Sequence, residues 1–152
     1  MSKIESRIHE LGYALPSAPA PAGSYANCVR TGNLLFLAGG IPPIDDDTYL
    51  GKVPTDTSIE TAQDAARAIT LNRLAVIKDE IGDLDKVSRI VNVGGFVNSE
   101  PNFYQHPDVI NGCSDLLVNI FGDKGIHSRT AMGASALPLN VSVEINMIIE
   151  IN

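Results

Sequence analysis

The sequence has no tryptophan and little aromatic content of any kind. Four tyrosines and four phenylalanines account for its aromatic fraction of 5%, so a packed core must rest on aliphatic side chains. Its two cysteines, Cys28 and Cys113, form no Cys-x-x-Cys pair. A single domain of 152 residues buries roughly 68–70% of its unfolded surface. We therefore expect one domain over residues 1–152, stable without a disulfide or a structural metal.

Basic residues are also scarce, with 11 against 18 acidic residues and a net charge of −7. Nucleic-acid binding requires clustered basic side chains that release counterions from phosphates. The basic residues here are spread along the chain and form no run, which makes a nucleic-acid partner unlikely on charge grounds. A small anionic ligand is compatible with this composition, because one arginine in a pocket can outweigh a negative surface.

Signals for membrane insertion and export are missing. No apolar run approaches the ~20 residues that span a bilayer. The N-terminal stretch MSKIESRIHELG is polar and amphipathic, without the apolar core and small-residue cleavage site of an export signal. We expect a cytoplasmic protein with reduced thiols and no membrane partner.

Helix signals occur in three places. Ser2 and Glu5 have capping-box spacing and Gly12 is a plausible stop, which predicts a short N-terminal helix. An extended connector rich in Pro and Ala follows, so residues 1–21 comprise this helix and the connector. Thr57 and Glu60 have the same capping-box spacing and open a long helix that Gly82 would close. A further helix runs from Pro107 to Gly122. The inner stripe of the long helix is apolar with one exception, and consists of Ile59, Ala62, Ala66, Ile69, Arg73, Val76 and Ile77.

Strand signals separate these helices. Residues 25–30 and 33–39 flank the turn sequence Thr-Gly-Asn and predict a hairpin. Residues 86–98 predict a third strand, in which Gly94-Gly95 indicates a bulge or a close approach to the backbone. Residues 128–135 and 141–152 predict a second hairpin. The last strand alternates strictly: its apolar face carries Val141, Val143, Ile145, Met147, Ile149 and Ile151, and its polar face carries Ser142, Glu144, Asn146 and Glu150.

This order of elements predicts an α+β fold, a mixed β-sheet with two main helices packed on one face. The opposite face is too polar for a dry core. It is either open to water or, as we favour, covered by a second subunit.

Two side chains near this face suggest chemistry. Glu144 lies in the middle of the last strand, and hairpin pairing would bring Arg129 toward the same region. A guanidinium can bind a substrate carboxylate through two hydrogen bonds, and a glutamate can deprotonate a water molecule. Each residue also has a plain alternative: a solvent-facing carboxylate for Glu144 and a surface ion pair for Arg129.

Other chemistries have weaker support. His9, His106 and His127 show no metal-ligand spacing, so no metal site is expected. Three adjacent aspartates, Asp45 to Asp47, lack the glycine and distant glutamate of a calcium loop and are interpreted as a solvated turn.

Three separated segments, residues 22–42, 96–122 and 127–151, resemble the RidA (YjgF-like) imine deaminase family, including the subgroup labelled endoribonuclease L-PSP. The closing segment, with its Arg, Leu-Pro and Val-Glu-Ile, is the most specific. The resemblance implies a chorismate-mutase-like fold, a homotrimer with sites between subunits, no cofactor, and hydrolysis of 2-iminopropanoate-type imines to a 2-keto acid and ammonia.

The resemblance also implies roles for individual residues. Arg129 corresponds to the arginine that holds the substrate carboxylate, and Glu144 to the glutamate that holds the water. Four further positions correspond to substrate-binding residues: Tyr25 over the pocket, Gly39 where ligand meets backbone, Asn111 on the helix, and the main chain of Ala131.

Two departures from the family pattern affect the substrate. Ala38-Gly39-Gly40 stands where the family usually has Ser-Gly-Gln, and Asn146 stands where an acidic residue is common. The loss of a hydroxyl and an amide leaves two alternatives to imine hydrolysis open. One is a non-catalytic binder of small carboxylates, and the other is the endoribonuclease or translation-inhibitor activity that labels some relatives.

Overall fold

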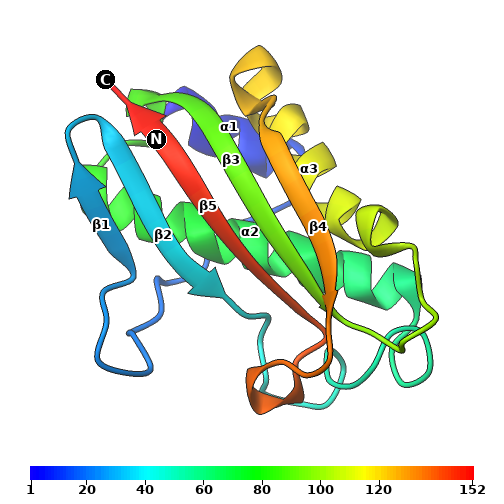
Figure 1. Ribbon diagram of the computed structural model, residues 1–152. Helices are drawn as coiled ribbons and strands as arrows, with labels where there is room; N and C mark the ends of the chain where they lie inside the picture. Colours follow the sequence, from blue (N-terminus) through cyan, green and yellow to red (C-terminus); the bar gives the residue numbers. More distant parts are fainter.

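The computed structural model describes residues 1–152 and contains one five-stranded mixed sheet (Figure 1). The C-terminal strand lies in its middle, because the strand order is β1-β2-β5-β3-β4. Neighbouring strands are antiparallel except β3 and β4, which are parallel. The strands are β1 (Cys28–Thr31), β2 (Leu34–Gly40), β3 (Val87–Asn98), β4 (Ser128–Ala134) and β5 (Val143–Ile151).

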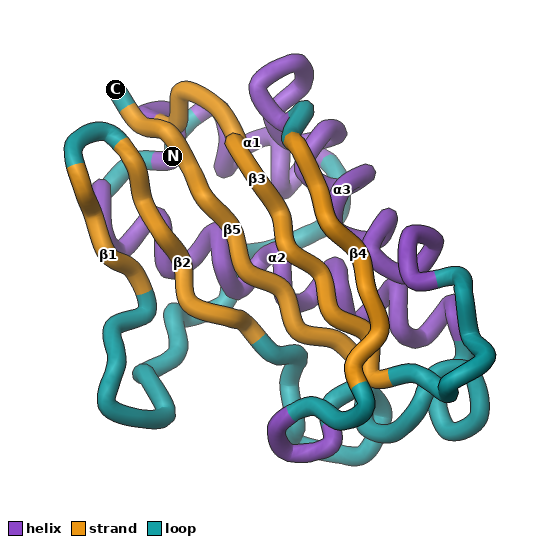
Figure 2. The backbone as a smooth tube through the Cα atoms, viewed as in Figure 1, coloured by secondary structure: helices purple, strands orange, loops and turns teal.

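All three α-helices lie on one face of this sheet, as Figure 2 shows. They are α1 (Lys3–Glu10), α2 (Ile59–Ile81) and α3 (His106–Phe121), with short 3₁₀ turns η1 (Leu84–Lys86), η2 (Gly122–Gly125) and η3 (Pro138–Asn140) between elements. The buried core fills the layer between α2, α3 and the sheet. The expected α+β fold, with two main helices on one face of a mixed sheet, is confirmed.

The helix ends follow the capping signals with one shift. Ser2 and Glu5 form the expected capping box at α1, in which Ser2 Oγ accepts from Glu5 N at 3.1 Å. At α2 the cap is Ser58 rather than Thr57, because Ser58 Oγ accepts from Thr61 N at 3.1 Å. Thr57 is buried and its hydroxyl donates to the Leu50 carbonyl at 2.7 Å instead.

The alternation of the last strand largely matches the structure. All six apolar residues from Val141 to Ile151 are buried, and the five within β5 belong to the core between helices and sheet. Ser142 departs from the expected polar face, because it lies before β5, is fully buried, and its hydroxyl has no hydrogen-bond partner. The open face is also less polar than predicted: Val29, Phe36 and Met132 are exposed there.

The predicted second hairpin is wrong. β4 pairs in parallel with β3, whereas β5 pairs with β2 and β3, so β3 separates the two strands. The connection through η3 includes left-handed residues Leu139 and Asn140. It carries the chain across the end of β3 and returns it on the other side, which a tight turn between adjacent strands cannot do.

The Gly94-Gly95 pair marks a close approach to the backbone on each face of β3. Of the two predictions for this pair, the close approach is confirmed and the bulge is not. An added Cβ at Gly95 would lie 2.5 Å from Cγ1 of Ile110 in α3, and one at Gly94 would lie 2.2 Å from Oδ1 of Asn146 in β5. The register irregularities of β3 fall earlier, between Val87 and Asn92. The glycines therefore admit side chains from both layers and do not form a bulge.

A third glycine sets the contact between the two main helices. An added Cβ at Gly112 would lie 2.4 Å from the backbone oxygen of Gln63 in α2. Replacing glycine by alanine in a helix normally gains about 1 kcal/mol, but overpacking costs about 1–3 kcal/mol. The close atom is a backbone oxygen, which cannot rotate away, so the overpacking cost lies at the upper end of this range. We expect Gly112→Ala to lower the free energy of unfolding by about 2 kcal/mol in urea denaturation. The exposed neighbour Asp115→Ala should not, and a Gly112→Ala protein as stable as the wild type would contradict the close crossing.

Candidate functional site

The first group of predicted site residues gathers where β4 faces α3. Arg129 pairs with the buried Val93 on β3, so its side chain points toward the helices. Its Nη1 donates to Asn111 Oδ1 at 2.7 Å and to Ser114 Oγ at 3.2 Å. Arg129 takes part in none of the ion pairs of the chain. Two of the predicted site residues, Arg129 and Asn111, are thus hydrogen-bonded to each other, and no protein carboxylate binds the guanidinium.

The position of β4 adds the backbone of Ala131 to this group. Ala131 lies two residues beyond Arg129 on the same face and pairs with Gly95. β4 is an edge strand, because β3 is its only neighbour. One row of its backbone N–H and C=O groups therefore lacks a sheet partner and can bind another molecule.

The second group lies around Glu144 on the central strand β5, beside the neighbouring strand β2. Tyr25, Gly39 and Glu144 line one pocket of about 470 Å³, beside the point where β2 ends. An added Cβ at Gly39 would lie 2.8 Å from Glu144 Oε2. The missing side chain therefore lets the carboxylate rest directly against the β2 backbone. Burial raises the pKa of Glu144.

The two groups do not converge within one chain. Arg129 faces the helices, whereas Glu144 lies between the buried Val143 and Ile145 and so points to the open face. Their strands are separated by β3, which places the backbones about 10 Å apart across the sheet. The expected hairpin contact is absent because the hairpin is absent.

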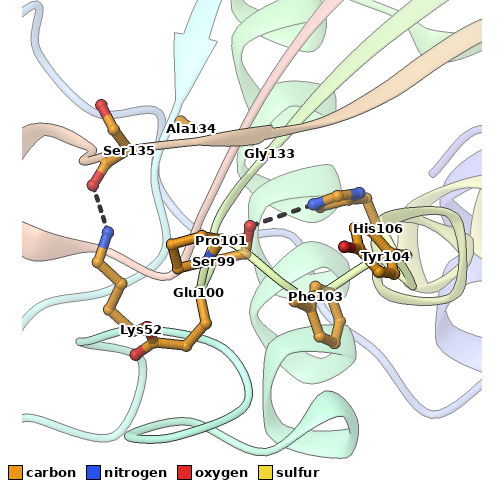
Figure 3. Close-up of a pocket in the computed structure, with 10 residues that line it drawn as sticks. All are labelled: Lys52, Ser99, Glu100, Pro101, Phe103, Tyr104, His106, Gly133, Ala134 and Ser135. Atoms are coloured by element: carbon orange, nitrogen blue, oxygen red, sulfur yellow. Dashed lines mark hydrogen bonds between the residues drawn. The ribbon is translucent and has the colours of Figure 1, made fainter.

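A larger pocket of about 630 Å³, drawn in Figure 3, contains none of the six predicted residues. Ser99 Oγ lies 3.1 Å from His106 Nε2, and Lys52 Nζ bonds to the Ser135 carbonyl. The rest of the lining is Glu100, Pro101, Phe103, Tyr104, Gly133 and Ala134. Sequence reasoning missed this pocket, since its residues come from three separate segments and no local motif joins them.

The Ser99–His106 contact resembles a nucleophile and its base, but the third member of such an arrangement is lacking. No hydrogen bond orients the other ring nitrogen of His106. An added Cβ at Gly133 would lie 2.6 Å from His106 Nε2. The pair thus links the start of α3 to the residue that follows β3, beside Gly133 of β4, and we assign it a structural role.

The remaining reactive groups are inert or solvated. Burial raises the pKa of the Cys113 thiol to about 12 and also raises that of Cys28, so neither is an activated nucleophile. Asp46 Oδ1 accepts from Thr48 N at 2.9 Å, which is the expected turn. No three His, Cys, Asp or Glu side chains are grouped to bind a metal. None of the helices has the length and apolarity needed to cross a membrane.

The raised pKa of Glu144 has a consequence for stability. The protonated carboxyl is favoured in the folded state, so the stability it confers is complete below its ordinary pKa and is lost as pH rises through the raised value. We expect Glu144→Gln to be at least as stable as the wild type at pH 7, with the difference shrinking toward pH about 4.

Urea denaturation at both pH values checks this expectation. Glu150→Gln, on the same face of β5, serves as the control and should show no such pH-dependent gain. A wild type clearly more stable than Glu144→Gln at pH 7 would mean that the chain stabilises the ionised carboxylate.

Comparisons with known proteins agree on one family. A family model described as "YjgF/chorismate mutase-like, putative endoribonuclease" matches residues 5–151. The chain is 36% identical to protein TCP17 of Trypanosoma cruzi, covering 99% of this chain and 95% of that protein. It is 28% identical to a 2-iminobutanoate/2-iminopropanoate deaminase of Dermatophagoides farinae, covering 90% and 92%.

A solved structure extends this likeness to three dimensions. The crystal structure of a protein of unknown function from Agrobacterium tumefaciens is 39% identical, with a TM-score of 0.91, over 99% of this chain and 93% of that one. The family model spans nearly the whole sequence. The observed fold and the resemblance of three separate segments indicate the same family. This chain belongs to the YjgF/chorismate mutase-like family.

Proposed function

We propose that this protein hydrolyses small 2-imino acids to 2-keto acids and ammonia, at sites shared between copies of the chain in a homotrimer. One copy would supply Arg129, Asn111 and the Ala131 backbone, and the next would supply Tyr25, Gly39 and Glu144. The observation that carries this proposal is the separation of two complementary half-sites. Arg129 has no carboxylate partner and Glu144 has no basic partner, and the two side chains lie on opposite faces of one sheet.

Each half-site suits its part of the reaction. Arg129 uses only Nη1 in bonds to the chain, which leaves its Nε and Nη2 donors for a two-pronged bond to a substrate carboxylate. A glutamate with a raised pKa is a better proton acceptor near neutral pH. Glu144 would remove a proton from water as the oxygen bonds to the imine carbon. Glu144 would pass this proton to the imine nitrogen as the C=N bond becomes single, and would then carry the hydroxyl proton to the same nitrogen. The carbonyl forms as the C–N bond breaks, so ammonia and the keto acid are released.

The open sheet face supports contact between copies. Val29, Phe36 and Met132 lie on this face and are exposed, together with the partly buried Ile148. Val29, Phe36 and Ile148 lie directly opposite one another across β1, β2 and β5, so they form one continuous apolar row. A contiguous exposed apolar row marks an interaction surface. The edge strand β4 beside this face offers unpaired backbone groups to the same partner.

Removal of the carboxylate anchor tests the activity. With 2-iminopropanoate made in the assay by an amino-acid oxidase acting on alanine, we expect Arg129→Ala to lower the rate of imine decay about 100-fold, because it loses two charge-assisted hydrogen bonds. Imine remaining is measured by trapping with semicarbazide. The exposed Arg30→Ala is the control. Equal rates for Arg129→Ala and wild type would refute the proposal.

Mixing two inactive variants tests the shared site. Arg129→Ala and Glu144→Gln chains are unfolded and refolded together in equal amounts. In a closed ring each site draws its arginine and its glutamate from different chains, so about one quarter of the sites regain both residues. We expect activity to return to roughly that fraction of wild type. No return of activity in verified mixed oligomers would overturn the shared site.

The same protein variants distinguish two other functions from imine hydrolysis. A non-catalytic carboxylate binder would show saturable keto-acid binding, lost in Arg129→Ala, with no imine decay; the absent side chains at Ala38 and Gly40 favour this alternative. An endoribonuclease would cleave RNA after rigorous purification and lose that activity in a site variant. The net charge of −7 argues against it.

A further inference from the structure

Arg73 is a buried charge without a counter-charge. It interrupts the apolar inner stripe of α2, and only 3% of its surface is exposed. Its three kinds of nitrogen bond only to neutral oxygens: Nη1 to the Ala38 carbonyl at 3.0 Å, and Nε and Nη2 to Asn72 Oδ1 at 3.1 and 2.7 Å. It takes part in no ion pair. A buried guanidinium without a carboxylate is costly, which calls for a functional explanation.

The neighbouring β2 backbone is shaped around this side chain. An added Cβ at Gly40 would lie 2.6 Å from Arg73 Nε and 2.9 Å from its Cδ. A side chain at position 40, such as the glutamine common in the resembled family, therefore cannot coexist with Arg73 in this position. The guanidinium occupies that space instead and replaces a neutral amide by a full positive charge.

The guanidinium also lies at an open strand edge. Ala38 N donates to the Asn27 carbonyl, but the Ala38 carbonyl accepts from Arg73, since the connector before β1 turns away there. The space between connector and strand is the 470 Å³ pocket, and Arg73 lines it together with Tyr25 and Glu144. Five N–H donors less three bonds leave one free N–H on each terminal nitrogen.

We propose that Arg73 is a second anion anchor, which selects substrates with a second carboxylate. The substrates would be imines of 2-oxo dicarboxylic acids, in which the first carboxylate binds Arg129 and the distal one binds Arg73. This inference rests on the proposed function, since it assigns a substrate class to the same pocket. The pocket falls in the usual range of ~300–1,000 Å³ for small-molecule sites, and is larger than a three-carbon acid requires.

Glu144 does not neutralise this charge. The two side chains form no ion pair, and burial is the one cause that shifts the pKa of Glu144. The positive charge of Arg73 is therefore available to a ligand. The competing interpretation is structural: Arg73 would only cap the carbonyl of Ala38 at the strand edge.

Ligand binding distinguishes these interpretations without relying on turnover. Calorimetry compares 2-oxoglutarate with 2-oxobutanoate on wild type, Arg73→Gln and Arg73→Lys. We expect wild type to prefer the dicarboxylate by about tenfold or more, from charge-assisted hydrogen bonds. Arg73→Gln, which keeps a donor for Ala38, should lose that preference, and Arg73→Lys should keep part of it. Arg67→Gln is the matched control, because Arg67 lies on the same helix, outside this pocket, and is ion-paired with Asp64.

Each outcome has one meaning. Equal weakening of both ligands by Arg73→Gln, or no change in their ratio, would overturn the anchor and leave a structural role. A wild type without preference for the dicarboxylate would overturn it as well. The protein could also show a preference for the dicarboxylate that depends on Arg73, yet hydrolyse neither 2-iminoglutarate nor 2-iminopropanoate. That result would refute the proposed reaction and leave the anion anchor in place.

Discussion

The insertion of β5 between β2 and β3 is the constraint on which the rest of the structure depends. It gives the last strand a neighbour on each side and buries its apolar face, whose five residues from Val143 to Ile151 join the core under the helices. It also pushes β4 to the sheet edge, where the strand can pair only with β3 in parallel. Arg129 is thereby directed to the helix side at one edge, and Glu144 to the open side at the centre. The division of the candidate site follows from strand order.

Local patterns in the sequence predicted most of the fold. Capping residues, the Thr-Gly-Asn turn and the alternation from Val141 to Ile151 each act over a few residues, so they are visible without knowledge of partners. Strand order is not local. The alternation of the last strand states which face is buried but not which neighbours it has, so a hairpin with residues 128–135 was as compatible as the observed place between β2 and β3. The shift from Thr57 to Ser58 has the same origin, since burial of Thr57 under the preceding loop is a tertiary effect.

The candidate site was predicted in its parts and not in its assembly. The strand pattern indicated Arg129 and Glu144, and the resemblance supplied the other four residues. The structure brings Arg129 to Asn111, and Tyr25 and Gly39 to Glu144. Arg73 was visible only as a break in an apolar stripe. Its relation to Gly40 depends on how closely α2 lies under β2, which no spacing in the sequence records. The Ser99–His106 contact is likewise a product of where β3 ends and α3 begins.

Gly39 and Gly40 place opposite charges on the two sides of one strand. The bare backbone at 39 accommodates a carboxylate from the open side, and that at 40 accommodates a guanidinium from the helix side. A side chain at 39 would displace the flexible end of Glu144, whereas one at 40 would meet Nε and Cδ of the buried Arg73. Among descendants of this sequence, a bulky residue at 40 can therefore arise only after position 73 has shortened. Homologues should carry either the arginine or the side chain at 40, and rarely both.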